Sequence, residues 1–493
     1  MSNGGETLKK ALMIAGASLI ALLLVFLVIE FVLGDDEETP GNWADRANVT
    51  DEAGESGEAD DSVTRAANRN KPGYTVMVYM NGSDLESSFY EEGSAYDGAA
   101  AADLSEMVAG LTGDEINVIV ETGGTLAWTY PGIDGSQNQR WKLEDGELRH
   151  LADLGPRNMG DPLTLTDFVV WSMENYPSNN YALIFWNHGG GSVLGFGVDE
   201  LFDGDSLTLD EIAAGLEGAY AQTGQTLELV GFDACLMATV ETAYAVSPYA
   251  NYLVASQELE PGHGWNYEPI LRYLSDNPAA GGAELGRVIV DSYREHAIEY
   301  EQDDMITLSV TDLGRVAAIV DALERFVAEA APEIEAGDSG FYALASSRAK
   351  AEDYGSASAD GEVTDMTDLA SIARNASANY PESADALIRA VQSAVVYNMH
   401  SKGRPNAAGL SIYFPHKDLN DYESNLEVYG QIGFSDSYFE FLQMYVSRLT
   451  GEKVEFSIME SNAGEFNWEY GTDDPEVYEI RIDPDDLERI AEI

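Results

Sequence analysis

Residues 181–191, YALIFWNHGGG, and residues 227–237, LELVGFDACLM, decide the predicted fold. Each begins with a largely apolar run and ends in a polar or Gly-rich turn. Further β-rich runs occupy residues 75–80, 116–122, 252–256, 306–312 and 409–414. Amphipathic helical stretches, such as residues 207–222 and 313–330, lie between them. Alternation of apolar strands and helices is typical of an α/β fold, so we predict a mostly parallel sheet with helices on both faces.

A histidine and the single cysteine of the chain follow two of these strands. His188 comes after the run at 181–186, and Cys235 comes after the run at 227–232. In open α/β sheets, catalytic groups gather beyond the carboxyl ends of the strands, so the two side chains can meet there. An imidazole beside a thiol can generate a thiolate nucleophile and protonate a departing amine. The pair therefore predicts a nucleophile, Cys235, with His188 as its base.

Backbone features extend this predicted site. Glycine at 189 lets a backbone N–H approach a substrate, so we predict an oxyanion hole formed by the amides of Gly189 and Cys235. The sequence also predicts a helix just past the cysteine, whose N-terminal potential would lower the pKa of the Cys235 thiol. The alternative interpretation is structural: a lone cysteine is often a small buried hydrophobic residue, and a Gly-rich turn is often only a turn.

The charge of the chain is strongly one-sided. The 493 residues include 87 acidic and 26 basic ones, which gives a formal net charge of -61, and the acidic residues are spread along the whole sequence. Such a surface repels nucleic acid and anionic lipid headgroups, which excludes nucleic acid as an expected partner. At molar salt the Debye length falls to about 3 Å and self-repulsion is screened. The composition therefore predicts a halophilic protein.

The ends of the chain differ from its middle. Residues 11–33 form an apolar run long enough to cross a bilayer, which predicts a transmembrane anchor; a cleaved signal peptide is the competing interpretation. Two lysines precede the run and acids follow it, so residues 1–10 are expected in the cytoplasm and the rest of the chain outside the cell. Residues 35–72 predict a disordered acidic tether. Residues 74–450 form the expected catalytic domain, and residues 451–493 an acidic appendage of unknown role.

Six segments resemble the clostripain family of cysteine peptidases. They span residues 75–86, 159–177, 181–191, 231–246, 254–271 and 407–415, in the order of that family and within residues 74–450. The resemblance implies a caspase-like α/β fold and a dyad of His188 and Cys235 that works through an acyl-enzyme. It also implies cleavage of protein or peptide substrates after Arg or Lys, with Asp233 lining the primary specificity pocket. A carboxylate there can bind a guanidinium bidentately.

Other residues are weaker candidates. Asn81, at the end of the first strand, is expected to border the specificity pocket. No transition-metal spacing such as H-E-x-x-H occurs, but the resemblance allows for calcium, and the acidic loop with Asp199, Glu200, Asp203 and Asp205 offers hard oxygen ligands.

The resemblance also implies maturation into two chains by a cut between the His and Cys blocks. No Lys or Arg lies between Gly189 and Ala234, so we predict a single-chain enzyme.

Two other functions are compatible with the sequence. One is a catalytically idle surface or adhesion module on the same fold. The other is a cysteine transpeptidase, which would pass the acyl group to an amine acceptor. The sequence leaves the oligomeric state and the natural substrate open.

Overall fold

The structure is a computed structural model that describes residues 71–89, 98–355, 364–417, 422–451, 458–461 and 480–482. The predicted cytoplasmic N-terminus (1–10), the anchor (11–33) and the tether (35–72), except its last two residues, lie outside the described residues. Most of the appendage (451–493) does so as well. In the part of the chain that the structure describes, no helix is both long and apolar enough to span a bilayer.

The main sheet has nine strands. In chain order they are β1 (Tyr74–Asn81), β2 (Ile116–Gly123), β3 (Asn138–Glu144), β4 (Glu147–Gly155), β5 (Asn180–Trp186), β8 (Leu227–Asp233), β9 (Ala250–Ala255), β10 (Thr307–Asp312) and β13 (Val395–His400). Smaller sheets are formed by β6 (Phe196–Asp199) with β7 (Asp205–Leu207), by β11 (Asp353–Tyr354), β12 (Met366–Asp368) and β14 (Ser411–Tyr413), and by β15 (Ile458–Ser461) with β16 (Ile480–Ile482).

The helices fill the connections. They are α3 (Ser83–Ser87), α4 (Ala99–Gly110), α5 (Pro162–Asn175), α6 (Gly191–Leu194), α7 (Leu209–Thr223), α8 (Val240–Val246), α9 (Tyr267–Asp276), α10 (Gly282–Glu299), the 3-10 helix η2 (Leu313–Arg315), α11 (Val316–Ala336), α12 (Asp338–Ala349), α13 (Leu369–Ala376), α14 (Pro381–Ala394), α15 (Tyr422–Gln431) and α16 (Asp436–Gly451).

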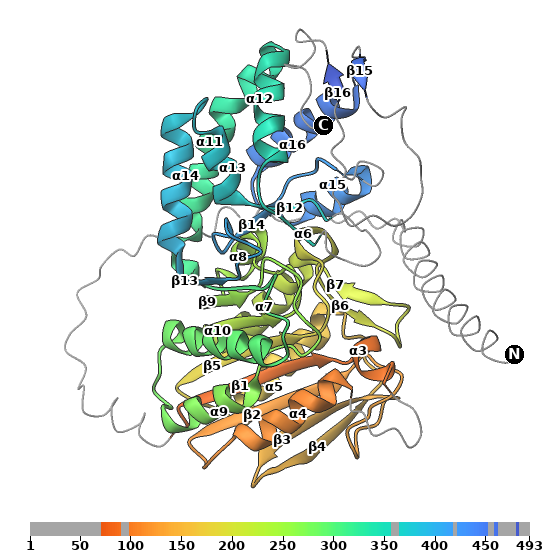
Figure 1. Cartoon of the computed structure of the whole chain (residues 1–493). Helices are drawn as coiled ribbons and strands as arrows, with labels where there is room; N and C mark the ends of the chain where they lie inside the picture. Colours follow the sequence, from red (N-terminus) through yellow and green to blue (C-terminus); the bar gives the residue numbers. More distant parts are fainter. Residues whose placement is uncertain are drawn as a thin grey trace, which may run out of the picture.

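The sheet is parallel at its centre and antiparallel at both edges. Its order is β13-β10-β9-β8-β5-β1-β2-β3-β4, and the five strands from β9 to β2 run parallel (Figure 1). The predicted α/β class with a large parallel sheet is therefore confirmed. Two expectations for individual strands are wrong. The run at 306–312 forms β10, which is antiparallel to β9, and the run at 409–414 forms β14 in the small three-stranded sheet.

Helices cover both faces of this sheet, which explains why its central strands are apolar throughout. In β1 every residue is buried, and successive side chains enter different cores. Met77 and Tyr79 join the core that contains residues of α5, α7 and α8. Val76 and Val78 join the core that contains residues of α4, α9 and α10. Side chains alternate along a strand, so a strand buried on both faces needs apolar residues at every position.

A helical layer stands on one end of the sheet. It contains α11 to α14 and α16, and in Figure 1 it occupies the upper half of the molecule. The amide of Ser411 in β14 donates to the Ala238 carbonyl at 2.9 Å, just before α8. The second half of the chain therefore supports the segment that follows the cysteine.

The order of the strands reverses direction between β1 and β5. The chain leaves β1 toward β2 on one side and leaves β5 toward β8 on the other, which makes this the switch point of the sheet. The two strand ends are tied together, since Asn187 Nδ2 donates to the Asn81 carbonyl and, at 2.8 Å, to Ser83 Oγ.

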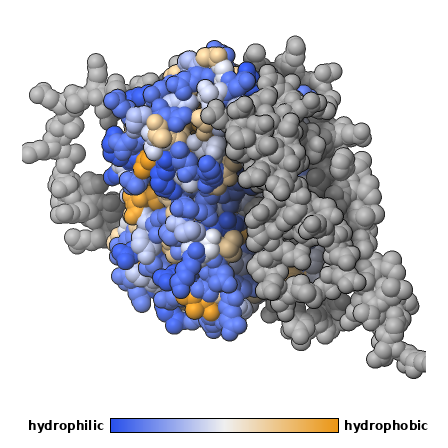
Figure 2. Space-filling model, turned by 45° about the horizontal axis from the view of Figure 1, so that its top comes forward, coloured by the Kyte–Doolittle hydropathy of each residue, from blue (hydrophilic) through white to orange (hydrophobic). Residues whose placement is uncertain are grey.

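Figure 2 shows one face of the molecule, on which hydrophilic residues predominate and hydrophobic ones form small separate patches. This distribution agrees with a net charge of -61.

Candidate active site

The predicted dyad lies at the ends of two adjacent strands. Trp186 of β5 pairs with Asp233 of β8, and His188 and Cys235 each follow two residues later. Both residues line one cavity of about 160 Å³. The complete lining is Leu85, Ala99, Asp103, Trp186, Asn187, His188, Asp233, Ala234, Cys235, Glu260, Pro261, Gly262 and Gly264. The fold therefore brings His188, Asp233 and Cys235 to a single cavity, as the sequence predicted.

His188 is oriented by a carboxylate. Its Nε2 lies 2.8 Å from Oδ1 of Asp84 in α3, and the two side chains are 41% and 58% exposed. The hydrogen bond from His188 lowers the pKa of Asp84 below its ordinary value, so the carboxylate is ionised. With Nε2 engaged in this bond, Nδ1 is the ring nitrogen that remains for proton transfer. The sequence analysis missed Asp84, although it lies within the quoted segment 75–86.

The thiol of Cys235 is buried and bound to a neighbouring loop. The Glu260 backbone N–H donates to Sγ at 3.2 Å. Burial raises the pKa of the thiol, and the nearby charge of Asp233 raises it further, while the Glu260 amide opposes this effect. The expected lowering of the thiol pKa by a helix is wrong. Helix α8 begins only at Val240, where Thr239 caps it, so its N-terminus does not adjoin the sulfur.

A sharp turn holds the cysteine in place. Leu236 has φ +64°, a left-handed conformation that costs a residue other than glycine about 1–3 kcal/mol. Two bonds to the loop after β9 stabilise this turn: the Leu236 amide donates to the Glu258 carbonyl at 3.2 Å, and the Ala238 amide donates to the Ser256 carbonyl at 2.8 Å. The loop after β9 therefore holds the main chain directly after Cys235.

The glycine after the histidine lies directly against the cysteine backbone. A Cβ atom added at Gly189 would lie 2.0 Å from the Cys235 carbonyl oxygen, so only glycine fits here. The adjacent amides at 190 and 197 bond to Gly195 and His188 carbonyls. Within the described residues, the amides of Gly189 and Cys235 donate to no other residue. The oxyanion hole formed by these two amides stays a prediction.

Buried acids form the floor of the cavity. Asp233 accepts from the Tyr267 hydroxyl at 2.8 Å and from the Trp265 amide at 3.2 and 3.3 Å. Asp103 of α4 accepts from the Trp186 indole at 2.6 Å. Burial raises the pKa of Asp233 to about 7. It raises the pKa values of Asp103 and Glu260 well above their ordinary range, and the charge of Asp233 adds to both shifts.

The cavity has no lysine or arginine in its lining. The three acids are therefore not neutralised by a basic side chain of the lining. Asp103 and Glu260 were missed from the sequence.

Asn81 does not occupy its expected place. Its side chain is buried and directed at the glycine backbones of 124 and 197, and it is not part of the cavity lining. The reason is geometric, because successive side chains of β1 point to opposite faces of the sheet. Its backbone carbonyl contributes indirectly by accepting a bond from Asn187.

The acidic loop suggested for calcium is engaged with the protein itself. Asp199 accepts from the Met159 and Leu201 amides, and Glu200 accepts from Ser87 and Thr125 hydroxyls. Asp205 accepts from the Asn158 amide group. Over the described ranges, no group of three or more His, Cys, Asp or Glu side chains is arranged to hold a metal ion.

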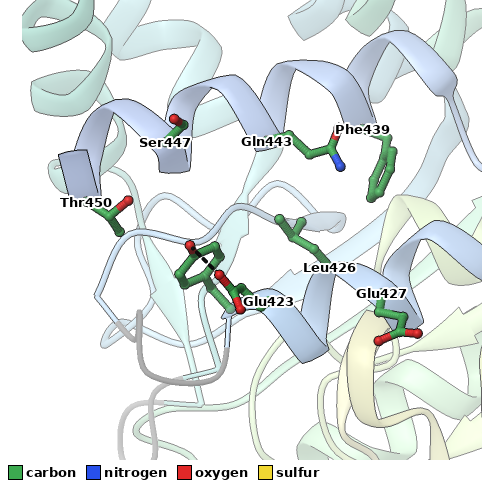
Figure 3. A pocket seen from close by; sticks show the side chains of 8 residues that line it. Glu423, Leu426, Glu427, Phe439, Gln443, Ser447 and Thr450 are labelled. Atoms are coloured by element: carbon green, nitrogen blue, oxygen red, sulfur yellow. Dashed lines mark hydrogen bonds between the residues drawn. The ribbon is translucent and has the colours of Figure 1, made fainter. Parts of the chain in front are cut away.

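A larger cavity lies elsewhere. It has about 360 Å³ and lies between α15 and α16 (Figure 3). Its lining is Tyr422, Glu423, Leu426, Glu427, Phe439, Gln443, Ser447 and Thr450. This set contains no cysteine or histidine, so the smaller cavity is the candidate active site despite its size.

Comparison with known proteins finds relatives of this chain. A model of the clostripain family matches residues 78–442. Clostripain of Hathewaya histolytica is 27% identical over 254 residues, and the match covers 45% of this chain and 45% of clostripain. The chain therefore spans less than half the length of that relative.

Two solved structures share the fold. One is a secreted C11 cysteine protease from Bacteroides thetaiotaomicron in complex with an irreversible peptide inhibitor, with TM-score 0.53, 17% identity, and coverage of 74% of this chain and 100% of the protease. The other is an inactive zymogen C11 protease from Parabacteroides distasonis, with TM-score 0.52, 18% identity, and coverage of 74% and 99%. At these identities the likeness concerns the fold.

Proposed function

The chain belongs to the clostripain family of cysteine-type endopeptidases, and we propose that it cleaves protein or peptide substrates after Arg or Lys. The observation that carries this proposal is the composition of one cavity. A thiol and an imidazole lie in the same lining as three buried carboxylates, with no lysine or arginine among them. The thiol and the imidazole can cleave a peptide bond, and the carboxylates can bind a cation. Together they favour a substrate with a basic residue directly before the scissile bond.

The proposed reaction starts with proton transfer from the Cys235 thiol to Nδ1 of His188. The thiolate attacks the scissile carbonyl carbon, and a carbon–sulfur bond forms. The resulting oxyanion accepts hydrogen bonds from the amides of Gly189 and Cys235. His188 then donates its proton to the amine nitrogen as the carbon–nitrogen bond breaks, which leaves a thioester.

Hydrolysis completes the cycle. His188 removes a proton from a water molecule, and the oxygen attacks the thioester carbon. The carbon–sulfur bond breaks, the acid product leaves, and the sulfur regains its proton from His188. Asp84 favours the imidazolium state through which both halves of the cycle pass, because its carboxylate lies 2.8 Å from Nε2. Asp233, near the guest cation, contributes charge to its binding.

We also propose that the enzyme acts at the outer surface of a halophilic cell. The proposal rests on the apolar run at 11–33, the two lysines before it and the net charge of -61. A fusion of residues 1–72 to a reporter, fractionated and treated with external protease, tests the placement. A reporter found in the soluble fraction or protected from external protease would exclude it.

Maturation is proposed to leave the catalytic domain as one chain. An enzyme specific for Arg and Lys has no site between Gly189 and Ala234, which contains neither residue. Mass spectrometry of the mature protein tests this proposal, since an N-terminus between these two positions would contradict it.

The central experiment uses fluorogenic peptides that differ only in the residue before the scissile bond, assayed in molar KCl. Wild type should prefer Arg and Lys, and Cys235→Ala and His188→Ala should each lose at least about 99% of kcat/KM. A thiol-directed probe that fails to label Cys235 would favour an idle module. Products joined to an added amine instead of water would favour a transpeptidase.

A further inference from the structure

Glu260 is the acid of the cavity whose carboxylate accepts no well-formed hydrogen bond from the described residues, although the Asp233 carboxyl and the Trp265 indole lie near it. Its carboxylate oxygens are both buried, and no hydrogen bond of acceptable geometry reaches either of them within the described residues. The Asp233 carboxyl lies close by, but two carboxylates repel each other, and the charge of Asp233 adds to the effect of burial in raising the pKa of Glu260. Over the same residues, no salt bridge to an Arg, Lys or His side chain involves Glu260.

Two neighbouring acids, Glu258 and Asp233, have binding partners within the protein. Glu258, two residues earlier, pairs with Arg404. Asp233 accepts three contacts, from the Tyr267 hydroxyl and the Trp265 amide. Two donors therefore bind the Asp233 carboxylate, whereas neither oxygen of Glu260 accepts a well-formed hydrogen bond from the described residues. Leaving a buried carboxylate unpaired is costly, and such groups are expected to meet a partner in the functional state.

The main chain of Glu260 places this free carboxylate beside the chemistry. Its backbone N–H donates to Sγ of Cys235 at 3.2 Å, while its side chain lines the cavity together with Asp233 and Asp103. One residue therefore contacts the nucleophile through its amide and faces the substrate pocket through its carboxylate.

We propose that Glu260 is a specificity-determining residue whose carboxylate binds the guanidinium or ammonium group of the substrate residue that precedes the scissile bond. This inference rests on the proposed function and deepens it. Asp233, held by Tyr267 and Trp265, supplies negative potential at the floor, and Glu260 makes the direct contact with the cation.

The test compares matched peptides with arginine or citrulline before the scissile bond, because citrulline has nearly the same shape but no charge. Glu260→Gln should lower the arginine-to-citrulline ratio of kcat/KM by about 10- to 150-fold, the range for a charge-assisted hydrogen bond. Its kcat/KM for citrulline should fall much less than its kcat/KM for arginine, because only the arginine peptide loses an ionic contact. Labelling of Cys235 by iodoacetamide checks that the backbone contact to sulfur is kept.

Glu268→Gln is the matched control. Glu268 lies on α9 next to Tyr267, pairs with Arg272 at 2.7 Å and is outside the cavity lining. It also removes one negative charge, and it should leave the ratio unchanged. Glu260→Asp retains the charge and should preserve part of the arginine preference.

The outcomes separate the two proposals. Wild-type selectivity for arginine that persists in Glu260→Gln would overturn the role of Glu260 and leave the proposed function intact. Equal ratios in the Gln and Asp variants would also overturn it, because the charge would then be irrelevant. A wild-type enzyme that does not distinguish arginine from citrulline would remove the basic specificity itself.

Discussion

Replacement of Asp84 by asparagine should weaken catalysis without weakening the fold. The carboxylate lies 2.8 Å from Nε2 of His188, on the side of the ring that faces away from its proposed proton-transfer nitrogen. Asparagine is nearly isosteric but carries no charge, so the variant removes the electrostatic support of the imidazolium and retains an acceptor. The expected result is a lower kcat/KM for every substrate, regardless of the residue before the scissile bond.

The magnitude follows from the exposure of the pair. A hydrogen bond between charged groups is worth about 1.5–3 kcal/mol when desolvated, whereas exposed ion pairs contribute about 0–1 kcal/mol. His188 and Asp84 are 41% and 58% exposed, which places the pair between these cases. We take about 0.5–1.5 kcal/mol, which corresponds to roughly 2- to 13-fold in kcat/KM. Asp84→Ala, which also removes the acceptor, should lie at or above the upper end.

The chain offers a closely matched control. His150 Nε2 and Asp153 Oδ1 are also 2.8 Å apart, and their exposure is 41% and 54%. This pair lies on β4, outside the candidate cavity. Asp153→Asn should therefore have a similar effect on melting temperature as Asp84→Asn, but no effect on kcat/KM.

The assay is kcat/KM as a function of pH for wild type and both variants in molar KCl. Because asparagine keeps an acceptor for the ring and removes only the charge, the loss of kcat/KM should appear in Asp84→Asn and not in Asp153→Asn. An Asp84→Asn enzyme with wild-type kcat/KM across the pH range would refute the positioning role. Equal losses in the Asp84 and Asp153 variants would point to a general charge effect.

Three other predictions concern the oxyanion hole, the acidic floor and the surface. Gly189→Ala should lower kcat/KM by about 100-fold or more, because its Cβ would lie 2.0 Å from the Cys235 carbonyl oxygen and displace the two amides. Gly281→Ala, which has open space around its Cβ, is the control and should keep its activity. Equal activities of the two variants would contradict this prediction. Burial raises the pKa of Asp233 to about 7. Between about pH 4 and pH 7, Asp233 therefore keeps a proton in the folded state that it has lost in the unfolded state. The free energy of unfolding of wild type, compared with that of a variant with a neutral residue here, should fall as the pH rises. The melting temperature of Asp233→Asn minus that of wild type, followed by circular dichroism, should therefore increase across this window, and a difference independent of pH would count against a buried neutral carboxyl. The melting temperature of wild type should rise from about 0.1 M to about 3 M KCl, since a net charge of -61 repels itself, and a salt-independent transition would contradict the halophilic interpretation.

The central strands and the dyad could be predicted because their signal is local. Continuous apolar runs mark strands buried on both faces, and the strand ends carry His188 and Cys235 within a few residues. The strands β3 and β4 gave no such signal, because they are largely polar and no residue of β4 is buried. Residues 409–414 show the same apolar pattern as a central strand, but periodicity does not specify which sheet a strand joins.

The acids of the site could not be predicted for a different reason. Asp84, Asp103 and Glu260 come from α3, from α4 and from the loop before α9. Only the folded chain brings Asp103 and Glu260 into the cavity and Asp84 to His188. In a sequence with 87 acidic residues, a single Asp or Glu carries almost no information by its identity. Asp233 was recognisable because it stands two residues from the cysteine.

The raised pKa of the thiol bears on how long the protein keeps its reactivity in air. Oxidants attack the thiolate, and a sulfenic acid that meets no second thiol can proceed to irreversible sulfinic and sulfonic acids. Cys235 is the single cysteine of the sequence, so no internal disulfide can rescue it. Burial and the charge of Asp233 keep the empty site in its thiol form. Burial of the sulfur, with a smaller contribution from Asp233, therefore slows the irreversible oxidation of the empty site.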